Sequence, residues 1–286
     1  MDSPQTPDDR AEPLGVVVGV DGSRIGLAAV RWAVAEARLR GLPLLILHAA
    51  PYAAGSTAGA RRARDILARA FTVAHRADPA LRTATDRTSL PAVESLLDAA
   101  QRAQLLVVGM GGGERPQEVL ISSVALDVSG RSPCPVVVVR GEQHPAPDAP
   151  VLVGVEDPAI DAAALTVAFE DAQRHRGRVV ALHAGHSAPF DLDTLAPWTT
   201  RFPEVPVEIT VVPGSPVPAL LAAAVDARLV ALGTRAHRAP ARVLFGSTSR
   251  AVLRRSPVPV VAVNPGAARL SGEPVATPAT PPATRT

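Results

Sequence analysis

The chain carries one pattern of apolar runs and turn residues twice, and this duplication limits its fold more than any other feature. His48 aligns with His183, 135 positions later, and Gly109 aligns with Gly233, 124 positions later. The copies therefore keep the same order, and the second is shorter between these two points. Two tandem copies of one small domain are the simplest arrangement for such a sequence.

Each copy alternates short apolar runs with segments of helical periodicity. In the first copy we expect strands at 16–20 and 44–48, with a helix between them that Gly41 ends. A third strand is expected at 207–212 in the second copy and, as a polar edge strand, at 81–85 in the first. This alternation predicts an α/β fold with parallel strands and right-handed crossovers.

The helix after the second strand differs between the copies. The second copy has only a short segment there, 191–202, which contains Pro197, so we expect a shorter helix. The first copy has a longer helical repeat, formed by Ala63, Ile66, Leu67, Ala70 and Ala74.

The domain boundaries follow from composition. With 286 residues, 47% of them hydrophobic, the chain can bury two cores, and only 3% are aromatic, so Ala, Val and Leu fill them. We expect domains at 14–140 and 151–264, joined by a proline-containing linker at 141–150. The polar segment 1–13 and the Pro-, Ala- and Thr-rich segment 265–286 are predicted to be disordered.

The residue types exclude several classes of protein. All 29 basic residues are arginine, so the chain lacks the lysine of a Walker A loop or a Schiff-base enzyme. The net charge of +2, without a basic run, gives no sign of nucleic-acid binding. Cys134, the only cysteine, is predicted to be structural. The sequence shows neither a signal peptide nor an apolar stretch of about 18 residues, so we expect no membrane contact and a cytoplasmic location.

Three segments of the first copy come to the carboxyl ends of the expected strands, where ligands bind in open parallel sheets. Asp21, Gly22 and Ser23 follow the first strand and could equally be ordinary turn and capping residues. His48 and Ala49 end the second strand. The fourth strand leads into the glycines 109, 111, 112 and 113, and Ser122 and Ser123 are predicted to open the next helix, whose amides could bind a phosphate.

In this order of motifs the sequence resembles the universal stress protein family in its tandem two-domain form, over nearly the whole of 14–264. The resemblance implies two Rossmann-like domains of the adenine nucleotide α hydrolase type, each a five-stranded parallel sheet of order 3-2-1-4-5 with helices on both faces. Some members bind ATP, which Mg²⁺ could accompany. The implied site of the first domain comprises Asp21, Gly22, Ser23, Ala49, Gly109, Gly112, Ser122, Ser123 and Val124.

Both copies depart from the family's phosphate loop. Ser122 stands where the motif has a glycine, and in the second copy Ala236 replaces the loop's second glycine while Glu156 replaces the aspartate. We therefore expect ATP in the first domain rather than in the second. The corresponding second site would comprise Glu156, Ala184, Gly233, Ala236, Gly246, Ser247 and Thr248.

The main hypothesis is a non-catalytic stress-response protein that binds adenine nucleotide. The alternatives are a ligand-free interaction scaffold and a weak ATPase or nucleotidyl-transfer enzyme. The Val-rich final strands at 136–139 and 258–263 could pair with each other as an internal pseudo-dimer, and a homodimer of the whole chain stays open. His183 and His186 do not form a metal site by themselves, so no metal or catalytic residue is predicted.

Overall fold

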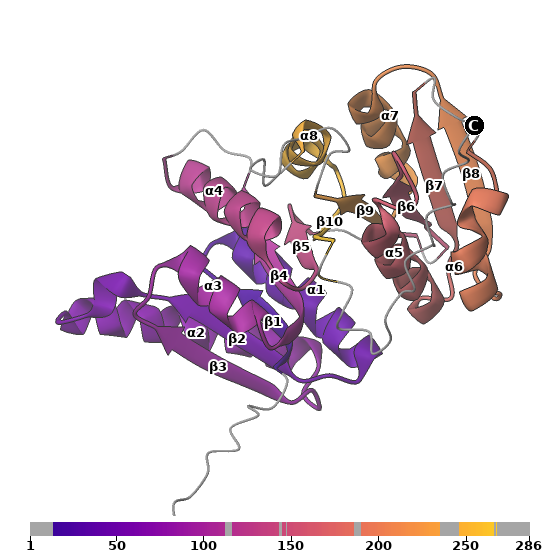
Figure 1. Ribbon diagram of the computed structural model, residues 1–286. Coiled ribbons are helices and arrows are strands. Elements are labelled where there is room, and N and C mark those ends of the chain that lie inside the picture. Colours follow the sequence, from indigo (N-terminus) through magenta and orange to yellow (C-terminus); the bar gives the residue numbers. More distant parts are fainter. Residues whose placement is uncertain are drawn as a thin grey trace, which may run out of the picture.

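The computed structural model describes residues 14–111, 116–142, 145–146, 148–185, 190–234, 246–265 and 267 (Figure 1). The predicted disorder at 1–13 and in 265–286 therefore lies outside the described residues, apart from Pro265 and Ala267. None of the described helices is both long and apolar enough to cross a membrane.

The first domain follows the expected alternation of strands and helices. Its elements are β1 (Gly15–Gly19), α1 (Arg24–Arg40), β2 (Leu44–Ala49), the 3-10 turn η1 (Pro51–Ala53), α2 (Thr57–Ala77), β3 (Thr83–Thr88), α3 (Ala92–Ala100), β4 (Ala103–Gly109), α4 (Pro116–Arg131) and β5 (Val136–Val139).

The second domain repeats this sequence of elements. They are β6 (Val151–Gly154), α5 (Ala162–Arg174), β7 (Val179–Ala184), η2 (Asp193–Leu195), α6 (Ala196–Arg201), β8 (Val207–Val212), α7 (Pro216–Ala223), η3 (Ala224–Asp226), β9 (Leu229–Gly233), α8 (Ser247–Arg255) and β10 (Val260–Val263).

The strand order of each domain is the expected 3-2-1-4-5. The first domain reads β3-β2-β1-β4-β5, and the second reads β8-β7-β6-β9-β10. The two domains do not form two separate sheets. Strands β5 and β10 are hydrogen-bonded neighbours, so all ten strands form one continuous sheet. In Figure 1 these two strands lie in the middle, between the indigo-to-magenta first domain and the orange second domain.

Local signals in the sequence explain where the helices begin and end. The hydroxyl of Ser23 accepts the backbone N–H of Gly26 at 3.0 Å and caps α1. Gly41, with a φ of 64°, ends the same helix in the left-handed conformation that glycine adopts at little cost. The 21-residue α2 is replaced in the second domain by η2 and the six-residue α6, as Pro197 in the sequence indicated.

The predicted start of the fourth helix is wrong. Ser122 and Ser123 lie within α4, which already begins at Pro116, rather than opening the helix. Proline is well suited to the first turn of a helix, and the residues that follow it are good helix formers, so the helix starts earlier than the family motif implies. In the second domain the helix does begin at Ser247, directly after Gly246.

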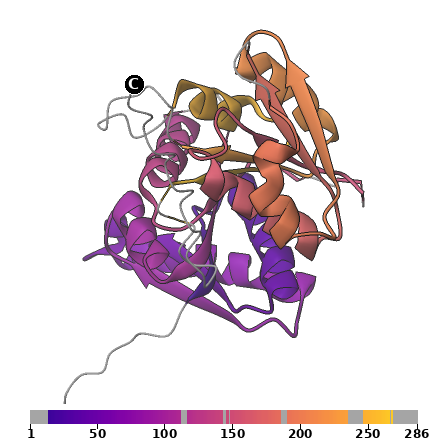
Figure 2. The same cartoon turned by 45° about the vertical axis from the view of Figure 1, so that its right-hand side comes forward.

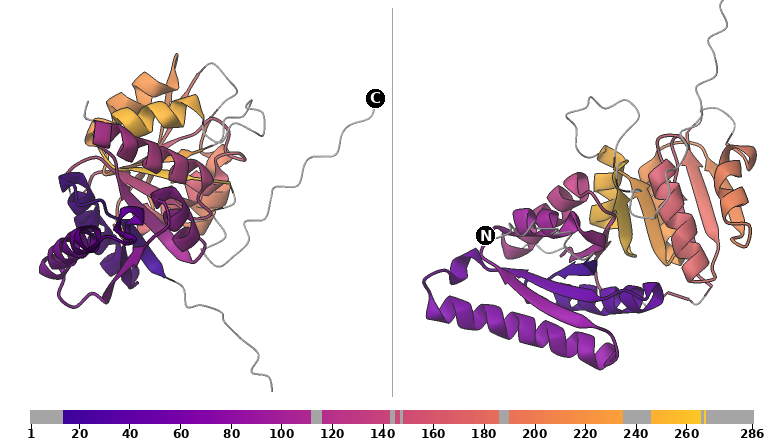
Figure 3. Two further views of the ribbon diagram at one scale, coloured as in Figure 1. Left: turned by 90° about the vertical axis from the view of Figure 1, so that its left-hand side faces the viewer. Right: turned by 60° about the horizontal axis from the view of Figure 1, so that its bottom comes forward.

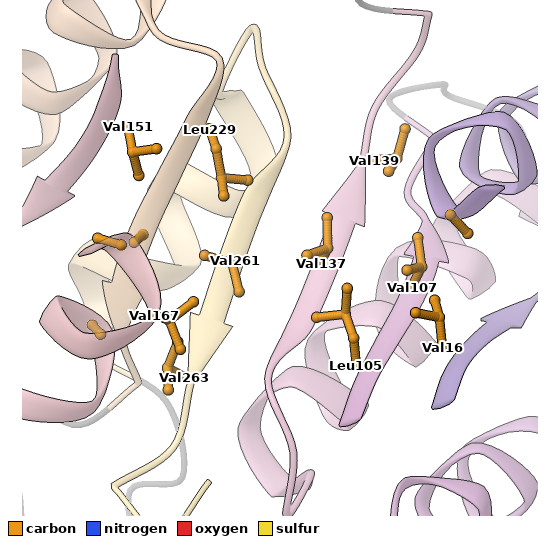
Figure 4. Close-up of a cluster of buried hydrophobic side chains, with 14 of the residues drawn as sticks. Val16, Leu105, Val107, Val137, Val139, Val151, Val167, Leu229, Val261 and Val263 are labelled. Atoms are coloured by element: carbon orange, nitrogen blue, oxygen red, sulfur yellow. The ribbon is translucent and has the colours of Figure 1, made fainter. Parts of the chain in front are cut away.

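The core consists of two apolar layers, one on each face of the sheet. Helices α1, α2, α5 and α6 cover one layer, and α3, α4, α7 and α8 cover the other. Both layers run through both domains, because alternate valines of β5 and β10 point to opposite faces. Figure 4 shows this for one layer, where Val137 of β5 and Val261 of β10 lie between the residues of the two halves.

The junction of the domains is antiparallel, and Val137 is in register with Val261. The eight residues of β5 and β10 are all buried. On one face of the junction α4 and α8 pack against each other (Figures 1 and 2). Each domain alone would expose one apolar strand edge here, and the pairing of β5 with β10 buries both edges.

Two residues that follow the final strands make reciprocal contacts across the junction. Arg140 follows β5 and donates to the carbonyl oxygens of Leu253 and Arg254 at the end of α8. Asn264 lies 124 positions later, follows β10 and donates to the carbonyl oxygens of Ser129 and Ser132 at the end of α4. Each domain thus caps a helix of the other, which relates the halves by an approximate two-fold axis.

A cluster of buried charges joins α1 to α5 on the other face. Glu36 bonds to Arg40 at 3.2 Å within its own helix and to His175, the residue that follows α5, at 2.9 Å. Asp171, 135 positions after Glu36, lies 3.8 Å from Arg228. Burial raises the pKa of the Asp171 carboxyl to about 6, and the nearby Glu36 carboxylate adds to the shift.

We predict that Asn264→Ala lowers the free energy of unfolding by about 1–3 kcal/mol, because the variant leaves two carbonyl oxygens at the end of α4 without their donor. Urea unfolding would measure the change. Glu142→Ala is the control, since its ion pair with Arg31 is half exposed and is expected to contribute less than about 1 kcal/mol. Equal effects of the two variants would contradict the capping role.

The raised pKa of Asp171 predicts a pH dependence of stability. The folded chain holds this proton more tightly than the unfolded chain, so the group favours folding at low pH and loses this effect as pH rises through about 6. The unfolding free energy of the wild type, minus that of Asp171→Asn, is expected to fall between about pH 4 and about pH 7. Asp98→Asn, on the exposed side of α3, is the control, and a flat difference for Asp171→Asn would contradict the prediction.

Candidate functional site

A cavity of about 260 Å³ lies at the carboxyl ends of β1, β2 and β4 in the first domain. This is the edge at which the order of strands reverses, because β2 and β4 lie on opposite sides of β1. The cavity is lined by Gly19, Val20, Asp21, Gly26, Leu47, His48, Ala49, Tyr52, Arg62, Ile66, Ala92, Ser95, Leu96, Val108, Gly109, Val124 and Ala125.

The structure brings four of the predicted residues together in this cavity, namely Asp21, Ala49, Gly109 and Val124. Gly22 lines an adjoining hollow, with a φ of 86° that favours glycine. The hydroxyl of Ser23 is used to cap α1. Gly112 lies outside the described residues, and of Ser122 and Ser123 only the helical backbone is described.

Gly109 has a packing role that the phosphate motif does not suggest. A Cβ atom at this position would lie 3.0–3.1 Å from the side chain and backbone of Ile25. The glycine therefore lets the end of β4 approach the start of α1 closely, which shapes the cavity from below. Gly19 is similar, since a Cβ there would meet Leu96 at 2.8 Å.

His48 is fixed by hydrogen bonds at both ring nitrogens. Nδ1 lies 2.7 Å from the carbonyl oxygen of Val20, so it must carry the proton and donate. Nε2 lies 2.9 Å from the hydroxyl of Tyr52, within hydrogen-bond distance. The imidazole therefore connects β1 to Tyr52 at the rim of the cavity, and neither ring nitrogen is free.

Tyr52 and Arg62 are among the lining residues that sequence reasoning missed. Tyr52 is 43% exposed at the rim, and the guanidinium of Arg62 lies 5.6 Å from the centre of its ring. Tyr52 is the only tyrosine in a chain with few aromatic residues, which was the available signal. Arg62 comes from α2, the helix that is shortened in the second domain (Figure 3).

Beside the cavity, α2 lines a shallow hollow of about 420 Å³ with a row of arginines. Its charged lining residues are Arg61, Arg62, Asp65 and Arg69 of α2 and Asp21 of the first domain's β1–α1 turn. Arg62 lines both the cavity and the hollow. With three arginines and two aspartates, the hollow keeps an excess of positive charge that can bind an anionic group while the apolar cavity binds a ring.

The second domain has a cavity of about 380 Å³ at the equivalent strand ends. Of the predicted residues, Ala236 lies outside the described part of the chain. The others line this cavity, and they are Glu156, Ala184, Gly233, Gly246, Ser247 and Thr248. The cavity also contains Asp161, which sequence reasoning missed, and burial raises the pKa of that carboxyl to about 6.

One group of three residues could in principle hold a metal ion, and it lies at the domain junction. Ligand atoms of Glu36, Asp171 and His175 lie within 4.8 Å of one another. Arg228 already approaches Nε2 of His175 at 3.0 Å, and Arg40 bonds to Glu36. Two guanidinium groups in contact with these residues oppose a further cation, so we interpret the group as an ion-pair cluster.

Cys134 is fully buried, and burial raises the pKa of its thiol to about 11. Its backbone N–H and carbonyl both bond to the hydroxyl of Ser132. The position belongs to the packing around β5 rather than to either cavity. The thiolate is the reactive form of cysteine, and little of it is present at neutral pH when the pKa is this high.

We predict that Cys134 does not react with Ellman's reagent in the folded protein at mildly alkaline pH, because the reactive thiolate is neither formed nor exposed. In urea the same sample is expected to release one equivalent of chromophore, which provides the internal control. Rapid labelling of the folded chain would show that β5 opens locally.

Comparison with known proteins places this geometry in context. A sequence model of the Universal stress protein family matches residues 15–140 and 192–264. Universal stress protein Rv2005c of Mycobacterium tuberculosis is 31% identical over 282 residues, which cover 86% of this chain and 96% of that protein. Universal stress protein Rv2623 of the same organism is 30% identical over 283 residues, with 87% and 95% covered.

A solved structure supports the fold over the same length. A universal stress protein from Archaeoglobus fulgidus superimposes with a TM-score of 0.69 at 18% identity, covering 87% of this chain and 96% of that chain. The similarity therefore includes both domains and their arrangement in one chain.

Proposed function

The chain belongs to the universal stress protein family, and we propose that its first domain binds an adenine nucleotide, with ATP as the ligand. The observation that supports this most is the succession of groups along one edge of the sheet. An apolar cavity ends at the carboxylate of Asp21, and the arginines of α2 follow directly.

Each part of this edge suits one part of a nucleotide. Ala49, Leu96 and Val108 provide an apolar slot at the end of β2 and β4 for the base. One carboxylate oxygen of Asp21 accepts the N–H of Ser23 at 2.9 Å, and the other can accept a ribose hydroxyl. Arg61, Arg62 and Arg69 would meet the phosphates, with any Mg²⁺ entering as part of the nucleotide.

The arrangement favours binding over turnover. Both nitrogens of His48 are engaged, so this side chain is not available to activate a water molecule. The chain has no lysine, and arginine does not lose its proton at neutral pH. We infer a protein that senses or stores nucleotide, in which any hydrolysis is slow.

Binding of a ligand in the cavity would affect the second domain through α4. Val124 and Ala125 of this helix line the cavity, and α4 packs against α8 across the junction. Asn264, from the second domain, holds the other end of α4. A ligand that shifts α4 therefore acts on the relation between the two halves.

Isothermal titration with ATP tests the proposal directly. We expect saturable binding below about 1 mM and a loss of about tenfold or more in Asp21→Asn, since a hydrogen bond to a charged group contributes about 1.5–3 kcal/mol. Asp98→Asn, exposed on α3 and outside the cavity, is the matched control. The absence of a heat of binding for the wild type at millimolar ATP would refute nucleotide binding.

The arginines of α2 are expected to act on the phosphates and not on the nucleoside. Arg62→Ala should weaken ATP by about tenfold or more and adenosine much less, because only ATP offers anionic partners. Arg76→Ala, exposed near the other end of the same helix, is the control. Equal losses for ATP and adenosine would place Arg62 against the base or ribose instead.

A further inference from the structure

The two cavities differ at one position that the family motif does not include. Asp161 lies 135 positions after Gly26, the same offset that relates His183 to His48. Both residues lie at the start of the helix that follows the domain's first strand, and both line their domain's cavity. At this position the first domain therefore has a glycine where the second has an aspartate.

The Asp161 carboxylate occupies the loop after β6. One oxygen, Oδ2, accepts the backbone N–H groups of Glu156 and Asp157 at 2.8 and 3.2 Å. The other, Oδ1, lies over the end of β9, where a Cβ atom added to Gly233 would be 2.5 Å away. Successive N–H groups in such a loop form a natural anion-binding site, and here the chain's own carboxylate fills it.

The same place in the first domain has no helix side chain in it. A Cβ atom added to Gly26 would lie 2.7 Å from Oδ1 of Asp21. A carboxylate at position 26 would therefore collide with the group that we assign to the ribose and would add a second negative charge.

Charge strengthens the difference between the cavities. Asp161 is 6% exposed, and burial raises the pKa of its carboxyl to about 6, so it is mostly ionised at neutral pH. Glu156, the counterpart of Asp21, adds a second carboxylate to the same cavity. Among the described lining residues there is no arginine, whereas Arg62 lines the first cavity.

The second cavity is not simply filled in. It retains about 380 Å³ of space. Nδ1 of His183 lies 3.0 Å from the carbonyl oxygen of Val155 and donates to it, which leaves Nε2 of the neutral imidazole as an acceptor. Nε2 has no partner among the described residues, although the side chain is only 4% exposed. The space and this acceptor suit a ligand with hydrogen-bond donors.

We propose that Asp161 is a built-in anion that occupies the loop after β6, at the position where the first cavity has Gly26 beside Asp21, so that the chain binds one nucleotide rather than two. Its carboxylate takes the loop N–H groups that an anionic ligand could use, and its charge repels the phosphates of a nucleotide. The second cavity is thereby reserved for ligands without phosphate. This inference rests on the proposed function for the assignment of nucleotide to the first cavity.

A reciprocal exchange of the two residues tests the proposal. Isothermal titration of the full chain with ATP at pH above the pKa of Asp161 would give the number of sites for the wild type, Asp161→Gly, Gly26→Asp and the double variant. We expect one site in the wild type, two in Asp161→Gly, none in Gly26→Asp and one in the double variant. Circular dichroism would establish that each variant is folded.

Asp161→Asn serves if the glycine variant does not fold. It keeps an acceptor for the loop N–H groups and removes the charge, and we expect it to raise the ATP affinity of the second cavity at least about tenfold. Two sites in the wild type, or no added site in either Asp161 variant, would overturn the inference. A wild type without any site refutes the proposed function, but a site gained in Asp161→Gly would still support the role of Asp161.

Discussion

The structure depends on the antiparallel pairing of β5 with β10. Each domain ends in a strand of four buried residues, and in isolation that strand would expose an apolar edge. Pairing the two edges makes one ten-stranded sheet and brings both core layers into continuity across the junction. The caps made by Arg140 and Asn264, and the ion-pair cluster around Glu36, follow from this placement, because each joins positions that the pairing brings together.

An approximate two-fold frame thus holds two unequal cavities. Their strand ends and helix starts correspond, but the groups that decide what binds do not. The first cavity has Arg62 and Tyr52 from segments around α2, which is much shorter in the second domain. The second has Asp161 at the position of Gly26.

Most of the fold could be predicted from the sequence. A parallel sheet that is buried on both faces has strands that are uninterrupted apolar runs, such as those that begin at Val136 and Val260. The start of α4 could not be predicted, since the local helix preference after Pro116 outweighed the spacing of the motif. Within the site, Asp21 and Ala49 could be predicted from the sequence, because the carboxyl ends of parallel strands meet at one edge of the sheet. Arg62 and Asp161 could not be predicted, because they reach the two cavities through the packing of α2 and α5 against the sheet, which no local sequence pattern encodes.

The most direct measurement is a crystal structure of the full chain grown with ATP and Mg²⁺. We predict electron density for one nucleotide, with the base beside Ala49, the ribose at Asp21 and the phosphates toward the arginines of α2, and we predict that Asp161 still bonds to the N–H groups of Glu156 and Asp157. Nucleotide in the second cavity, or none in the first, would contradict the assignment of unequal sites.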